Sequence, residues 1–198
     1  FRALAHVEID HYACETLRTR MRYYGYRNAD EEVIEHDITS EDIIERIENA
    51  THGRLVDVII GGPPCQAYST AGRVRDGEGM ARDPRNYLFE SYVHILEHFE
   101  PKFFVFENVT GLLSARVDGG LIFPRVIHAL GNHYKVVDDP SILVHNTANY
   151  GVPQMRERFI CVGIKRGEGE RFVFPEETYY DPEKVAEADR GDKEPWVT

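Results

Sequence analysis

A cysteine on a stiff turn is the first candidate for chemistry in this sequence. The run Gly61-Gly62-Pro63-Pro64-Cys65-Gln66 follows the apolar segment Val56–Ile60, which predicts a strand. Two glycines allow backbone conformations that other residues avoid, and two prolines stiffen the chain that follows. A thiol held at a strand end becomes a nucleophile when a nearby helix or cation lowers its pKa. We therefore interpret Cys65 as a reactive thiol rather than as a buried structural cysteine.

A carboxylate and two arginines are the groups that would complete such a site. Glu107 follows the apolar run Phe103–Phe106, where poor solvation would raise the pKa of its carboxyl group and let it hold or donate a proton near neutral pH. Arg156 and Arg158 precede the last predicted strand, and in extended chain they would point to the same side and grip an anion or a carbonyl. Taken singly, each of these charges is more often solvated surface.

Acidic residues also end two other predicted strands. Glu8 closes the first one, a position where a carboxylate commonly binds the ribose hydroxyls of an adenosine-containing cofactor. Asp37 follows the next strand, where it would receive an adenine amino group. Acids at strand ends are frequent, so these two residues gain weight only in combination with the other segments.

Short β-rich runs alternate with helical periodicity along the chain, which indicates a parallel α/β sheet whose ligands gather at the carboxyl ends of the strands. Strands are predicted over Leu4–Val7, Val33–Ile34, Val56–Ile60, Phe103–Phe106, Ile142–Val144 and Phe159–Ile164. Helices are predicted over Ala13–Tyr24, Ile43–Ile47 after a capping box at residues 39–42, Leu88–Phe99 and Phe123–Leu130.

The composition is that of a globular domain. The chain has 198 residues, of which 42% are hydrophobic, enough for one α/β domain with a core. No apolar run approaches the ~20 residues of a membrane span, and the three separated cysteines suggest neither a zinc site nor a disulfide framework, so we expect a cytoplasmic protein without a metal. The net charge of −11 by itself argues against a nucleic-acid partner.

Taken in order, these segments resemble the C5-cytosine-specific DNA methyltransferases over about residues 5–165. The most specific piece is Gly62-Pro63-Pro64-Cys65-Gln66 with Ser69 following, and the next is Glu107-Asn108-Val109. The stretches 83–89 and 146–158 also match, and Glu8 and Asp37 fall where the family binds ribose and adenine.

The resemblance implies a Rossmann-like, S-adenosylmethionine-dependent methyltransferase fold, here incomplete, with a mostly parallel sheet and helices on both faces. It implies transfer of a methyl group from S-adenosylmethionine to C5 of a cytosine that has been flipped out of DNA. Cys65 would attack C6, while Glu107 contacts N3 and the exocyclic amine. Arg158 would contact the O2 side of the ring, and Arg156 would help to hold the site.

The resemblance also assigns the surrounding residues. Cofactor contacts would come from Glu8, Ile9, Asp37, Ile38, Pro64 and Leu88. Substrate or DNA contacts would come from Gln66, Ser69, Asn108, Arg73, Arg75, Arg82 and Arg85, with residues 67–86 as a surface loop that closes over the DNA. The implied partners are double-stranded DNA and, for a restriction–modification enzyme, a restriction endonuclease.

The family's Gly-rich opening segment and its target-recognition region have no counterpart in this sequence. We therefore interpret residues 1–165 as part of the catalytic domain and 166–198 as a connector toward a target-recognition domain, and we expect little or no activity from this chain alone. Three alternatives stay open: the same chemistry on cytosine in transfer RNA, an inactive regulatory or binding fragment on the same scaffold, and a redox-active Cys65, although that thiol lacks a resolving cysteine close in sequence.

Overall fold

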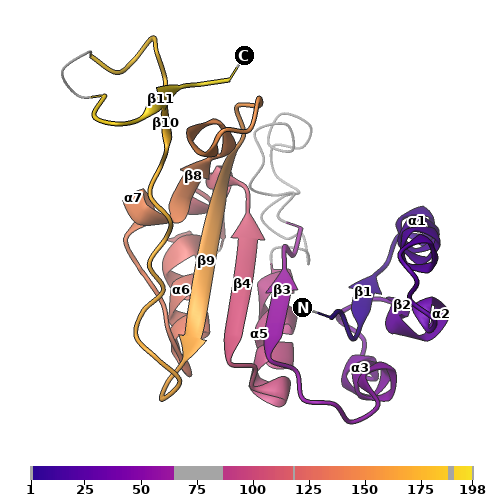
Figure 1. Cartoon of the computed structure of the whole chain (residues 1–198). Coiled ribbons are helices and arrows are strands. Elements are labelled where there is room, and N and C mark those ends of the chain that lie inside the picture. The colour runs from indigo at the N-terminus through magenta and orange to yellow at the C-terminus, as the bar shows by residue number, and fades with distance from the viewer. Residues whose placement is uncertain (1, 65–86, 118, 187–189, 198) are drawn as a thin grey trace.

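The largest sheet carries five strands. The structure is a computed structural model that describes residues 2–64, 87–117, 119–186 and 190–197. The sheet contains β3 (Val58–Gly61), β4 (Phe103–Asn108), β9 (Glu157–Lys165), β7 (Tyr134–Lys135) and β8 (Val144–Asn146). β3 and β4 are parallel, whereas β9 runs antiparallel to β4, β7 and β8 (Figure 1). The carboxyl ends of β3 and β4 therefore meet at one edge.

Two helices cover one face of this sheet. α5 (Leu88–Phe99) and α6 (Ile122–Gly131) lie behind the strands in Figure 1. Alternate residues of β4 and β9 point toward these helices, and Phe104, Phe106 and Phe159 are fully buried among them. Both helices carry apolar residues at the spacing of one helical face, so their burial follows from the sequence pattern.

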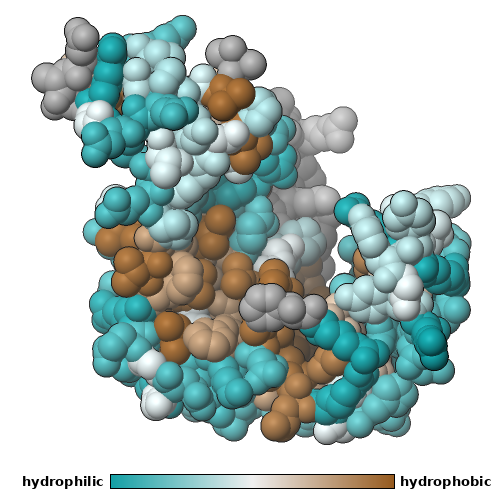
Figure 2. All heavy atoms as spheres, viewed as in Figure 1, coloured by the Kyte–Doolittle hydropathy of each residue, from teal (hydrophilic) through white to brown (hydrophobic). Residues whose placement is uncertain are grey.

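The opposite face of β3, β4 and β9 is apolar but half open. Its side chains include Ile60, which is 75% exposed, and Phe103, which is 38% exposed. Figure 2 shows apolar side chains gathered on this side, over β4 and β9. Among the described residues no helix covers this face, so the expected two-sided covering by helices does not extend to the five-stranded sheet.

The two-stranded parallel sheet of β1 (His6–Glu8) and β2 (Val33–Glu35) does have helices on both sides. α1 (His11–Tyr23) and α2 (Ala29–Glu32) pack on one side in a cluster with Val33. α3 (Ile43–Thr51) packs on the other side against Ile34, and the same cluster contains Ile95 of α5. This shared cluster joins the small sheet to the large one.

The remaining elements are short. They are η4 (Thr110–Leu113), β5 (Arg116–Val117), β6 (Gly120–Leu121), α7 (Pro140–Leu143), η5 (Thr147–Tyr150), β10 (Tyr179–Tyr180) and β11 (Glu194–Pro195). The side chain of Asn149 in η5 donates to Glu177 at 2.6 Å and accepts from Trp196 Nε1 at 2.9 Å. These bonds tie the C-terminal segment to η5.

Most predicted elements are confirmed, and three details are wrong. The five-stranded sheet is not mostly parallel, because β9 runs antiparallel to each of its neighbours β4, β7 and β8. Ile142 was predicted in a strand but lies in α7, because Asp139 caps the Ser141 amide and Pro140 starts a helical turn; the strand begins at Val144. The predicted capping box before α3 does not form, because the Asp42 carboxylate binds His36 and Arg46 instead. No helix in the described part of the chain is long and apolar enough to cross a membrane.

Candidate active site

The turn after β3 leads toward Cys65 and passes close to Glu107. The structure describes this turn as far as Pro64, with Pro63 buried and Pro64 exposed. A Cβ atom added to Gly62 would lie 2.8 Å from Oε2 of Glu107, so a larger residue at this position would force the carboxylate to shift. The predictions for Cys65, Gln66, Ser69, Arg73, Arg75, Arg82 and Arg85 lie outside the described residues.

Glu107 and Arg158 form an ion pair at the carboxyl end of β4. Nε of Arg158 lies 2.9 Å from Oε1 of Glu107. Glu107 is paired with Ile160 across the β4–β9 ladder, and Arg158 is two residues further along β9 on the same face. The side chains of Glu107 and Arg158 are 43% and 23% exposed. The prediction that the Glu107 carboxylate is poorly solvated is therefore wrong. The charged group beside Glu107 is an arginine that is distant in the sequence but lies on the neighbouring strand β9.

The segment before β9 is pinned by side chains of β8 and η5. Oδ1 of Asn146 accepts from the backbone amide of Arg156 at 3.2 Å, and the hydroxyl of Thr147 donates to the Gln154 carbonyl at 2.6 Å. The structure brings Arg158 to Glu107, while Arg156 lies just before β9 with its side chain exposed. Of the two predicted arginines, Arg158 is the one that the fold joins to the candidate acid.

Two buried polar side chains hold the strands that carry this site. The hydroxyl of Tyr92 on α5 donates to the carbonyls of Val105 at 3.1 Å and Ile59 at 3.3 Å, so it joins α5 to both β4 and β3. Burial raises the pKa of the Tyr92 phenol, which therefore stays a hydrogen-bond donor. The side chain of Asn108 donates to the Pro63 carbonyl at 3.1 Å. The role of Tyr92 could not be predicted from the local sequence pattern, because its partners are 13 and 33 residues away.

The predicted cofactor residues lie at the ends of β1 and β2. Oε1 of Glu8 accepts from the backbone amides of Ile9 at 2.8 Å and Asp10 at 2.9 Å, which fixes the carboxylate at the strand end. Asp37 accepts from the amide and the hydroxyl of Thr39, and these bonds lower the pKa of its carboxyl group. Ile9 beside them is 66% exposed. Fixed carboxylates next to an exposed apolar side chain suit the hydroxyls and the flat base of an adenosine.

The other predicted cofactor residues flank this region or the turn after β3. Ile38 is half-buried and contacts the cluster beneath α3. Leu88 is the first residue of α5 and is half-buried, and Pro64 is exposed at the end of the described turn. These positions agree with a site along the carboxyl ends of the parallel strands.

The two cysteines in the described residues are sealed in the core. Cys14 and Cys161 have no exposed surface. Burial raises the pKa of Cys161 to about 12, and burial together with nearby carboxylates raises the pKa of Cys14. Both therefore stay protonated near neutral pH and cannot reach a substrate. No group of acidic, histidine and cysteine side chains suited to a metal ion occurs among the residues that the structure describes.

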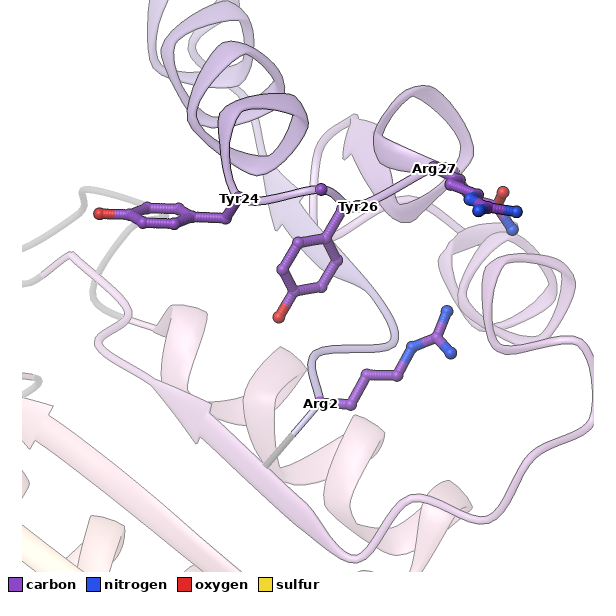
Figure 3. A pocket seen from close by; sticks show the side chains of 6 residues that line it. Arg2, Tyr24, Tyr26 and Arg27 are labelled. Atoms are coloured by element: carbon purple, nitrogen blue, oxygen red, sulfur yellow. The ribbon is translucent and has the colours of Figure 1, made fainter.

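A hollow of about 480 Å³ lies away from these residues, beside the end of α1. It is lined by Arg2, Tyr24, Tyr26 and Arg27 together with Gly25 and Asn28 (Figure 3). Arg2 lies 3.5 Å from the fully buried Glu32 carboxylate, which offsets its charge. Residues 24–28 follow the C-terminal end of α1, whereas Glu8 precedes its start, so we do not assign the candidate chemistry to this hollow.

Comparison with known proteins gives the family that this chain matches. The family model described as C-5 cytosine-specific DNA methylase matches residues 1–193. The Type II methyltransferase M1.HphI of Haemophilus parahaemolyticus is 36% identical over 193 residues, covering 95% of this chain and 46% of that protein. The Type II methyltransferase M.Bpa9945I of Bacillus paralicheniformis is 32% identical over 222 residues, covering 84% of this chain and 49% of that protein. The chain thus spans about half the length of these relatives.

Solved structures show the same fold. The Dnmt2 methyltransferase of S. pombe superposes with a TM-score of 0.56 at 15% identity, over 97% of this chain and 51% of that one. The methyltransferase EhMeth of Entamoeba histolytica gives a TM-score of 0.55 at 21% identity, over 81% of this chain and 44% of that one. The predicted methyltransferase fold class is therefore confirmed.

Proposed function

Because the chain belongs to the family of C-5 cytosine-specific DNA methylases, we propose that the full-length protein transfers a methyl group from S-adenosylmethionine to C5 of cytosine in double-stranded DNA. The observation that carries the proposal is the Glu107–Arg158 ion pair beside the Gly62–Pro64 turn. Cys65 follows this turn directly in the sequence, and we propose that its thiol acts together with the carboxyl group of Glu107 and the guanidinium of Arg158.

Cys65 is the nucleophile of the proposed reaction. Its thiolate adds to C6 of a flipped-out cytosine, and the electron pair of the C5–C6 double bond moves toward N3 and O2. C5 then bonds to the methyl group, which leaves the sulfonium sulfur of the donor. Loss of the C5 proton and expulsion of the Cys65 thiolate restore the aromatic ring. The buried Cys14 and Cys161 support this assignment by elimination.

Glu107 and Arg158 stabilise the charge that forms during the addition. The Glu107 carboxyl group holds a proton at N3 and accepts from the exocyclic amine, which draws electrons away from C6. Arg158 keeps that carboxyl group in one orientation and donates to the O2 side of the ring. Arg156 helps to hold the segment before β9, whose backbone is fixed by Asn146. A thiol without this pair would meet a ring that is too electron-rich to accept it.

The residues at the ends of β1 and β2 fit the adenosine part of the cofactor. S-adenosylmethionine supplies an electrophilic methyl group when it is bound. We assign Glu8 to the ribose hydroxyls and Asp37 to the adenine amino group, with Ile9 and Ile38 against the base. Pro64 and Leu88 would complete the site nearer to the turn.

Calorimetric titration with S-adenosylhomocysteine tests the cofactor site without measuring catalysis. Glu8→Gln should weaken binding by about 10- to 100-fold, because it removes charge-assisted hydrogen bonds to the ribose of about 1.5–3 kcal/mol. Glu97→Gln makes the same change on the exposed side of α5 and should bind as the unmodified protein does. Equal affinity of the Glu8 variant would move the ribose site elsewhere.

The DNA contacts and partners are also proposals. We assign base and backbone contacts to Gln66, Ser69 and the arginines 73, 75, 82 and 85, and the segment after residue 165 leads toward the part that reads the sequence. We also propose that the enzyme works in the cytoplasm and has a restriction endonuclease as its partner.

Methyl transfer by the full-length protein tests the proposed function. Duplex DNA incubated with labelled S-adenosylmethionine should gain 5-methylcytosine, identified by mass spectrometry of the nucleosides. Glu107→Gln should lower kcat on the order of 100-fold or more, because the amide cannot hold the proton at N3. Cys65→Ser should reduce transfer to background. Methylation of transfer RNA but not of DNA would overturn the assigned substrate, and binding of cofactor without any transfer would favour a regulatory fragment.

A further inference from the structure

Resting on the proposed function, we propose that Asn108 is a positioning residue that fixes the turn before Cys65 against the end of β4. Asn108 is the last residue of β4, and only 4% of its surface is exposed. Its side chain lies on the helix-covered face of the sheet, opposite to the face that carries Glu107. The family resemblance had assigned Asn108 to the substrate, but its burial places it beneath the site.

The carboxamide of Asn108 bonds to two neighbouring segments at once. Nδ2 donates to the Pro63 carbonyl at 3.1 Å, which joins β4 to the turn after β3. Oδ1 accepts from the backbone amide of Val109 at 2.8 Å, which holds the start of the η4 turn. One planar group therefore joins the end of β4 to a residue that lies 45 positions earlier in the sequence.

The chemistry of the turn explains why a donor is needed at this position. Pro63 and Pro64 have no backbone N–H, so their backbones can form hydrogen bonds only through the carbonyl oxygens. A carboxamide provides the donor for Pro63 while it keeps an acceptor for Val109. A carboxylate of the same shape provides the acceptor alone.

Two consecutive residues of β4 thus contact two consecutive residues of the turn. Glu107 lies against Gly62 on one face, and Asn108 holds Pro63 on the other. This pair of contacts fixes the position of the turn relative to the Glu107 carboxyl group. In the proposed reaction the thiol and the carboxyl group must act on one cytosine ring, and a misplacement of about 1 Å costs about 100-fold in rate.

Single-turnover trapping tests this role in the full-length protein. A duplex that contains 5-fluorocytosine forms a covalent adduct that cannot lose the C5 substituent, so both the rate constant and the final amplitude can be measured. Asn108→Asp keeps the acceptor and the shape but removes the donor. Its rate constant should fall about 100-fold at saturating DNA and cofactor, while the amplitude and the affinity for S-adenosylhomocysteine stay within about twofold.

The controls separate positioning from stability. Asn49→Asp makes the same chemical change on the exposed side of α3 and should alter neither the rate constant nor the amplitude. If Asn108→Asp does not fold, Asn108→Ala, which adds no charge to the core, is judged by the same criterion. A wild-type rate constant in the fraction of variant molecules that reacts would overturn the inference, because it would mean that Asn108 only stabilises the fold.

The wild-type protein distinguishes this inference from the function on which it rests. If the wild-type protein forms no adduct, the proposed function fails. If it forms one and Asn108→Asp forms it at the same rate, only the role of Asn108 fails.

Discussion

Glu107 is shared between a strand partner and a turn. Arg158 holds one carboxylate oxygen at 2.9 Å, and the other oxygen occupies the space that a side chain at position 62 would fill. Both contacts act on a group that is partly exposed, so they orient it more than they bury it. An orientation fixed before the base arrives reduces the reorganisation that accompanies charge movement in the reaction.

Gly62→Ala should therefore reduce activity more than stability. The new methyl group would displace the Glu107 carboxylate from Arg158, and we expect kcat/KM for DNA to fall by about 10- to 100-fold. The melting temperature should change little because position 62 is exposed. Gly131→Ala, whose added methyl group would meet Val136 at an ordinary 3.6 Å, is the matched control. An active Gly62→Ala enzyme would show that the carboxylate does not need this space.

At the scale of elements, the β4–β9 ladder is what delivers Arg158 to Glu107. Six residue pairs run from Phe103–Ile164 to Asn108–Phe159, and Gly163 lies within this ladder against the ring of Phe104. A Cβ at position 163 would lie 2.0 Å from that fully buried ring. The close approach of strand and ring fixes the register on which the ion pair depends.

Gly163→Ala should destabilise the fold through overpacking. We expect the free energy of unfolding to fall by about 1–3 kcal/mol, because neither the ring nor the strand can move without opening the core. Urea denaturation of this variant beside Gly131→Ala measures the difference. Equal midpoints for the two variants would contradict the packing described for β4 and β9.

The sequence predicted the elements better than the contacts between them. The runs around Ile60, Phe104 and Phe159 predicted their strands because alternation and burial are local properties. The prediction of a poorly solvated Glu107 was wrong because its partner Arg158 is 51 positions away, and the local sequence pattern does not indicate that pairing. The bond from Asn108 to Pro63 was missed for the same reason. The capping box predicted before α3 was also wrong, because the Asp42 side chain bonds to His36 and Arg46 and not to the start of the helix.

At the scale of the molecule, histidine protonation sets a pH dependence of stability. Burial lowers the pKa of His6 and of His145, so the folded state resists their protonation. The unfolded chain, with a histidine pKa of about 6.5, then binds more protons as the pH falls below that value. Their contribution to stability is present above about pH 6.5 and is lost on acidification. Hydrogen bonds lower the pKa of carboxyl groups such as Asp37, and these groups lose their contribution to the free energy of unfolding only near pH 4 and below.

We therefore expect the free energy of unfolding to decrease between about pH 7.5 and pH 5.5. His145→Gln should make this decrease smaller, because glutamine does not titrate and can still bond to the Tyr150 hydroxyl, which lies 3.0 Å from Nδ1 of His145. Chemical denaturation at several pH values gives the two slopes. Identical slopes for the variant and the unmodified chain would mean that His145 does not contribute to the pH dependence of stability.

The identity of the residue that is trapped on a 5-fluorocytosine duplex decides whether Cys65 is the nucleophile. Full-length protein incubated with a 5-fluorocytosine duplex and S-adenosylmethionine can be digested, and the peptide that carries the nucleotide can be sequenced by mass spectrometry. The convergence of the Gly62–Pro64 turn with Glu107 and Arg158 predicts that the modified residue is Cys65. A nucleotide attached to Cys14, to Cys161 or to any residue other than Cys65 would contradict the account.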